Sequence, residues 1–103
     1  MTTATIHDSA KAGFSRYYFG RSGHVWETAT FPETRRWELL AAQVLNGNIT
    51  TNQEAHDYFM DGIGTHPVPW SGISTRTKML WHGVMFEIRR VGDAATIAGK
   101  DAA

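Results

Sequence analysis

The chain has 103 residues, and its ten lysine and arginine residues are balanced by ten aspartate and glutamate residues. A chain of this length forms one domain and buries a core without covalent cross-links. The absence of cysteine excludes disulfides, thiolate metal sites and cysteine nucleophiles. The balanced charge argues against a protein that grips many nucleic-acid phosphates, because such proteins carry a basic surplus.

The composition along the chain predicts a lead-in, one domain and a tail. Residues 1–12 are small and polar and are expected to form a flexible lead-in, residues 13–92 the single globular domain, and residues 93–103 a frayed tail. The first ten residues contain no apolar run typical of a secretory signal, and no segment approaches the roughly 18 apolar residues of a membrane span. We therefore expect a cytoplasmic protein with no membrane partner.

Aromatic residues dominate the start of the predicted domain. Six of them fall between residues 14 and 31: Phe14, Tyr17, Tyr18, Phe19, Trp26 and Phe31. A four-residue segment bracketed by Gly20 and Gly23 separates two runs rich in aromatic and β-branched residues, which predicts a β-hairpin. Because an isolated hairpin is marginal in water, it must pack on the elements that follow.

Two helices joined by a short turn are predicted next. The first begins near Pro32, and its apolar face has helical spacing: Trp37, Leu40, Ala41, Val44 and Leu45. Gly47 is expected to take a left-handed cap conformation after it. Thr51 and Glu54 have the spacing of a capping box, which predicts a second helix over residues 52–61.

After a loop predicted over residues 62–74, Ser74 or Thr75 caps a third helix that runs to about Val91 and ends at Gly92. The alternative is a strand over residues 84–91. The expected fold is therefore α+β and helix-rich, with an N-terminal β-hairpin packed on two or three α-helices.

Two groups of residues are predicted to bind partners. Aromatic side chains beside an arginine are typical of protein interfaces, and the first group is Tyr17, Tyr18, Arg21 and Trp70. Hydroxyl and cationic side chains surround the predicted N-terminus of the third helix, where a phosphate or an acidic partner is favoured. This second group is Ser74, Thr75, Arg76 and Lys78.

No motif predicts a catalytic residue, a cofactor or a metal. No two histidines share the i, i+4 spacing of a helical metal site, and His56 is expected to be a surface residue. The sequence has no nucleophile elbow, phosphate loop or dinucleotide fingerprint. An enzyme is therefore the less favoured interpretation, although residues distant in sequence can still assemble a site.

The preferred interpretation is a small non-enzymatic protein-binding module. It would act as a regulator, adaptor or inhibitor of a larger protein machine, of the kind that phages and other mobile elements encode. The alternative is a nucleic-acid-binding regulator that uses the basic N-terminus of the third helix. A helix-turn-helix motif is disfavoured because about a dozen residues, rather than about 3–4, join the last two helices. A homodimer is compatible with either interpretation.

Overall fold

The computed structural model describes residues 3–61 and 68–97. These residues form four α-helices and two 3₁₀ helices, and no strand occurs within the two described ranges. In chain order the elements are α1 (Thr3–Tyr17), η1 (Trp26–Thr28), α2 (Phe31–Leu45), α3 (Asn52–Asp61), η2 (Trp70–Gly72) and α4 (Thr75–Ile97). The predicted α+β fold is therefore wrong, and the described protein is all-helical.

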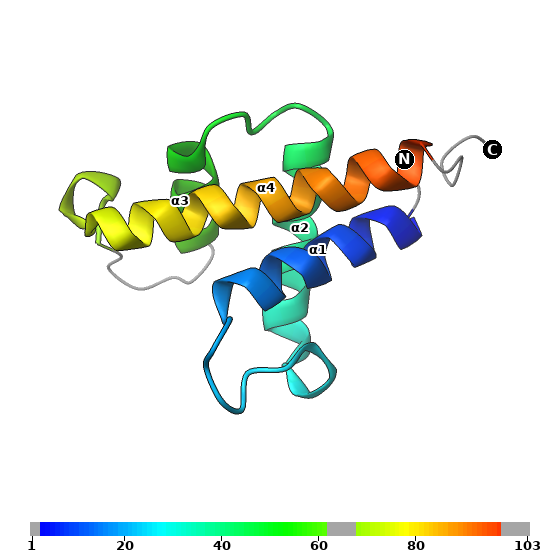
Figure 1. The fold of residues 1–103 in the computed structure, drawn as a ribbon, viewed down its shortest axis with the longest axis horizontal. Helices are drawn as coiled ribbons and strands as arrows, with labels where there is room; N and C mark the ends of the chain where they lie inside the picture. The colour runs from blue at the N-terminus through cyan, green and yellow to red at the C-terminus, as the bar shows by residue number, and fades with distance from the viewer. Residues whose placement is uncertain (1–2, 62–67, 98–103) are drawn as a thin grey trace.

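The longest helix, α4, is the one on which the other α-helices pack. Figure 1 shows α1 and α4 side by side and running in opposite directions, with α2 crossing them. The most extensive helix–helix contact joins α1 to α4, and α2 packs on α1, α3 and α4. The shorter α3 packs on α4 and η2, so each of the other three α-helices of the described residues contacts α4.

Neither predicted strand of the β-hairpin is a strand in the structure: the first lies mostly in α1, and the second contains a 3₁₀ helix and a short non-helical segment. Phe14, Tyr17 and Tyr18 belong to or directly follow α1, and their spacing places them on one face of a helix. The second run contains η1 and the start of α2. Strand preferences span only about 1 kcal/mol, whereas burying one large apolar side chain contributes about 1.5–3 kcal/mol. Burial on the helical core therefore outweighs the local preference.

Residues 3–12, which the composition predicted to be a flexible lead-in, form the first turns of α1. Their buried side chains are small: Thr5, Ser9 and Ala10. One turn later, Gly13 lies against α4, where an added Cβ would stand 2.9 Å from Ile88 Cγ1. The first turns of this helix therefore pack through small residues and lack the large buried apolar side chains by which a helix is usually recognised, whereas Phe14, near the end of α1, is large and buried.

The two helices predicted in the middle of the chain are confirmed as α2 and α3. Trp37, Leu40, Ala41 and Val44 are buried on one face of α2. Gly47 has a φ of 81°, the left-handed conformation expected of a residue just past a helix end. The capping box before α3 is also present and is described with the site below.

The predicted third helix is confirmed as α4, and residues 84–91 are helical rather than extended. Val84 and Ile88 are buried while Phe86 is exposed, which is a helical and not a strand pattern. Gly92 does not end the helix, which continues to Ile97. An added Cβ at Gly92 would meet the Leu45 side chain, so this glycine serves the packing of α4 on α2. Of the predicted loop, residues 62–67 lie outside the described residues.

Aromatic rings fill the centre of the core. Trp37 and Trp81 are fully buried, with nearly parallel rings whose centroids lie 6.3 Å apart. Phe14 and Phe59 pack against Trp37 at 6.2 and 4.5 Å between centroids. Neither buried indole Nε1 has a hydrogen-bond partner within the described part of the chain.

Candidate functional site

Tyr17 and Tyr18 were predicted to form a partner-binding surface, and both rings contact other parts of the chain. Tyr17 is half-buried, and its ring lies 5.5 Å from the rings of both Trp37 and Trp81. Burial raises the pKa of the Tyr17 phenol, an effect that nearby Arg21 partly opposes. The Tyr17 ring therefore belongs largely to the edge of the core.

Tyr18 is held by polar and aromatic neighbours. Its hydroxyl donates a hydrogen bond to Glu33 Oε1 at 2.6 Å, and its ring stacks on His24 at 4.5 Å between centroids. Burial, together with this hydrogen bond and the negative charge of Glu33, raises the pKa of the Tyr18 phenol well above its ordinary value. Glu33, in the first turn of α2, therefore holds the residue that directly follows α1.

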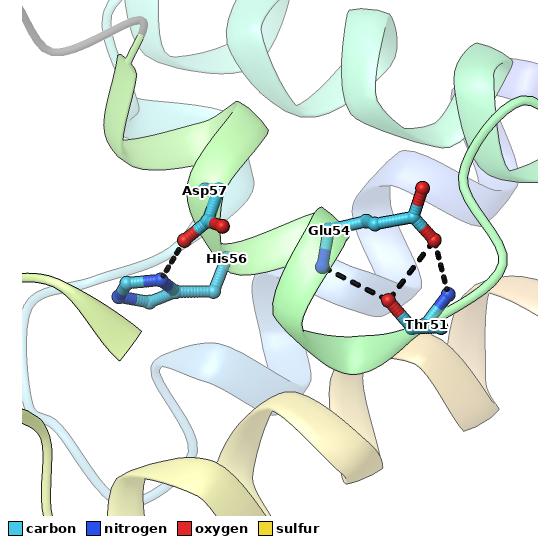
Figure 2. Close-up of polar contacts among 4 residues, drawn as sticks. All are labelled: Thr51, Glu54, His56 and Asp57. Atoms are coloured by element: carbon cyan, nitrogen blue, oxygen red, sulfur yellow. Dashed lines mark hydrogen bonds and ion pairs between the residues drawn. The ribbon is translucent and has the colours of Figure 1, made fainter. Parts of the chain in front are cut away.

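Trp70 is half-buried in η2 and covers a buried histidine. Its ring lies 5.5 Å from that of His56, which also meets Trp81 edge-on at 5.8 Å. His56 is only 2% exposed, so its predicted surface position is wrong. Figure 2 shows the His56 ring turned toward Asp57, with 2.9 Å between Nδ1 and Oδ1.

The capping box at the start of α3 satisfies the first turn of that helix. Figure 2 shows Thr51 Oγ1 accepting a hydrogen bond from the Glu54 backbone N–H at 3.1 Å. In return, Glu54 Oε1 accepts hydrogen bonds from the backbone N–H and hydroxyl of Thr51 at 3.1 and 3.0 Å. These hydrogen bonds, with others from Thr50, lower the pKa of the Glu54 carboxyl.

The second predicted group, around the start of α4, does not form one cluster. Ser74 Oγ accepts a hydrogen bond from the Thr77 backbone N–H at 3.1 Å and thus caps α4. The Lys78 ammonium lies 5.6 Å from the centroid of the Trp70 ring, whereas Arg76 lines a hollow that Trp70 and Lys78 do not line. Thr75 is the exposed first residue of α4. Arg76 and Lys78 therefore serve different parts of the surface.

The hollow at Arg76 brings together residues from both predicted groups. It measures about 520 Å³ and lies between the end of α1 and the first half of α4. Arg16, Arg21 and Arg76 line it, and none of the described residues that line it is acidic. Within the described part of the chain, no ion pair joins any of these three arginines to a carboxylate. We call this feature the arginine hollow.

Apolar side chains surround the arginine hollow and two adjoining ones. Phe19 (79% exposed) and Met79 (60% exposed) line the arginine hollow, and Phe86 (58% exposed) lines a second hollow of about 490 Å³ along α4. His82 lines both, and Arg90 links the second hollow to a third. Because the three hollows share lining residues, we group them as one surface, the α1–α4 surface, defined by Arg16, Phe19, Arg21, Arg76, Met79, His82, Phe86 and Arg90.

Most of the α1–α4 surface was not predicted from the sequence. Only Arg21 and Arg76 were singled out, each for a different site. A weak signal was present in α4, where Met79, His82 and Phe86 recur at helical spacing on the side opposite the buried residues Trp81, Val84 and Ile88. Arg16 and Phe19 offered no such signal, because the segment containing them was interpreted as a strand.

The described residues contain no group of three or more histidine, cysteine, aspartate or glutamate side chains placed to hold a metal ion. No helix among the described residues has the length and apolar character needed to cross a membrane. Comparisons with protein-family models, curated proteins and solved structures give no match to this chain.

Proposed function

We propose that this chain is a small non-enzymatic protein-binding module that receives a segment of a larger partner protein on its α1–α4 surface. One observation carries this proposal: three large apolar side chains, Phe19, Met79 and Phe86, are mostly exposed around adjoining hollows on one surface. Exposed apolar groups gathered beside hollows are typical of interaction sites. A partner that covered them would gain the free energy of removing them from water.

The composition of the surface supports a protein as the partner. Phenylalanine, methionine and arginine are enriched at the centres of protein interfaces. Here Phe19 and Met79 share the arginine hollow with three arginines, so apolar and cationic contacts lie within reach of one segment. The tyrosines that were predicted as anchors are mainly occupied by contacts within the chain, so Phe19, Met79 and Phe86 take that role in the proposal.

Site-specific photocrosslinking tests this proposal. A photoreactive benzoylphenylalanine at position 86 should capture a defined partner from the source cells, whereas the same group at exposed position 31 should not. The captured protein is then purified, and its affinity is measured by calorimetry. Phe86→Ala combined with Met79→Ala should weaken binding by at least about tenfold, because a few central anchors supply most of the affinity.

Phe31→Ala is the matched control, since Phe31 is 76% exposed at the start of α2 and lines none of the three hollows. It should leave the affinity unchanged. Equal crosslinking from positions 31 and 86, or full affinity in the Phe86 and Met79 double variant, would contradict the proposed surface.

A further inference from the structure

We propose that the arginine hollow is a receptor for carboxylate side chains on an acidic segment of the partner, and that Gly83 is the residue that positions Arg16 in it. This inference rests on the proposed protein-binding function and names the chemistry of the partner. Arginine guanidinium groups bind carboxylates through paired, charge-assisted hydrogen bonds. The hollow contains three such groups, from α1, the segment after it, and α4.

Charge complementarity points to a negatively charged occupant. The whole chain has no net charge, yet no described residue lining the arginine hollow is acidic. Two other cations of the described residues are paired with carboxylates, Arg90 with Glu87 at 2.7 Å and Lys11 with Glu27 at 3.1 Å. The arginine hollow therefore keeps cationic groups available for ligand carboxylates.

The same hollow favours an acidic protein segment over a nucleic acid. Nucleic-acid affinity grows with the number of phosphates neutralised along a strand, and a neutral chain offers no long-range field to attract a polyanion. Three arginines in one hollow supply few such contacts. Phe19, Met79 and Leu80 line the hollow beside them, which suits a segment that alternates acidic and apolar side chains.

The absence of a side chain at Gly83 leaves the space that the Arg16 guanidinium occupies. An added Cβ at position 83 would meet the Arg16 Nε, and would stand 2.9 Å from Nη2 and 3.0 Å from Cζ. A glycine inside a helix is normally unfavourable, and here its missing side chain lets Arg16 lie across α4. Gly83→Ala should therefore preserve the fold while moving Arg16 out of its position, because only the end of a flexible side chain has to shift.

Fluorescence anisotropy with two short labelled peptides tests the proposal. One alternates glutamate with leucine, and the matched control carries glutamine in place of every glutamate. The acidic peptide should bind the wild-type chain and weaken as salt is added. Arg16→Ala, Arg76→Ala and Gly83→Ala should each reduce its affinity by about tenfold or more. Arg35→Ala, an exposed arginine on α2 that lines none of the three hollows, should not change it.

Nuclear magnetic resonance separates positioning from folding in the Gly83→Ala variant. The Arg16 Nε–Hε resonance should shift in this variant, while the thermal midpoint stays at or above that of the wild type. An unmoved resonance, or full affinity for the acidic peptide, would overturn the positioning role.

Three outcomes would overturn the carboxylate receptor: equal affinity for both peptides, no binding of the acidic peptide at low salt, or preferential binding of a short single-stranded DNA that depends on the same arginines. Equal peptide affinity would leave the proposed protein-binding function intact. The crosslinking test at Phe86 is independent, because Phe86 does not line the arginine hollow.

Discussion

Replacing Trp37 by alanine should destabilise the protein by about 3–5 kcal/mol, the range observed for truncating large buried aromatic side chains. Trp37 has no exposed surface and lies at the meeting point of α1, α2, α3 and α4. Its ring contacts four others: Phe14, Tyr17, Phe59 and Trp81. The alanine variant would lose these contacts together and leave a cavity that surrounding helices fill only in part.

Trp37→Phe gives a sharper test of the same reasoning. Phenylalanine removes part of the ring but also removes the indole N–H, which has no hydrogen-bond partner within the described residues. Leaving such a group buried costs about 1–3 kcal/mol. Removing the cost of the unpaired N–H should offset much of the packing energy that the smaller ring loses. The expected decrease in the free energy of unfolding for Trp37→Phe is therefore about 1 kcal/mol or less.

Urea unfolding followed by far-ultraviolet circular dichroism measures both variants. Phe31→Ala is the control on the same helix, and its mostly exposed ring should contribute less than about 0.5 kcal/mol. A loss below about 1 kcal/mol for Trp37→Ala would show that Trp37 is not at the centre of the core. Equal losses for Trp37→Phe and Trp37→Ala would refute the argument from the unpaired N–H.

Four further predictions concern the capping box of α3, Tyr18 and the alternative function. Thr51→Ala should lower the free energy of unfolding by about 1 kcal/mol, because it removes one half of the capping box. The lowered pKa of Glu54 means that its contribution is present above the ordinary glutamate range and is lost as the pH falls through the folded-state value, so Glu54→Gln should flatten the acid limb of a stability–pH profile. The raised pKa of Tyr18 gives the opposite pH dependence. The contribution of Tyr18 to the free energy of unfolding is present below about pH 10 and is lost as the pH rises, so Tyr18→Phe should reduce the loss of stability at alkaline pH in urea titrations. Finally, the wild-type chain should give no gel shift with DNA or RNA even at low salt, and a shift abolished by combining Arg76→Ala with Lys78→Ala would establish the nucleic-acid alternative.

Local signals in the sequence were sufficient to predict α2, α3 and the start of α4. The apolar spacing from Trp37, the glycine at position 47 and the Thr51–Glu54 pair each act within one or two helical turns, so they needed no knowledge of distant contacts. The start of α4 is set in the same way by Ser74. These elements are confirmed because backbone geometry and capping are local properties.

Tertiary packing determined that the N-terminal segment is helical rather than extended. Aromatic residues from Phe14 onward fit either a strand or a helix face, and contact with Trp37 and Trp81 favours the helix. The small residues before them belong to the same helix, and Gly13 allows α1 to approach α4 closely. The α1–α4 contact joins residues far apart in the sequence, so no local pattern could report it.

The candidate surface also depended on tertiary structure. Length, composition and zero net charge are properties of the sequence alone, and they excluded cysteine chemistry and a general basic surplus. A total charge does not show how charges are distributed in space, and only the antiparallel packing of α1 and α4 brings Arg16, Arg21 and Arg76 to one hollow. Local interactions therefore determined most of the helices, while long-range packing determined the all-helical fold and where its cationic and apolar groups meet.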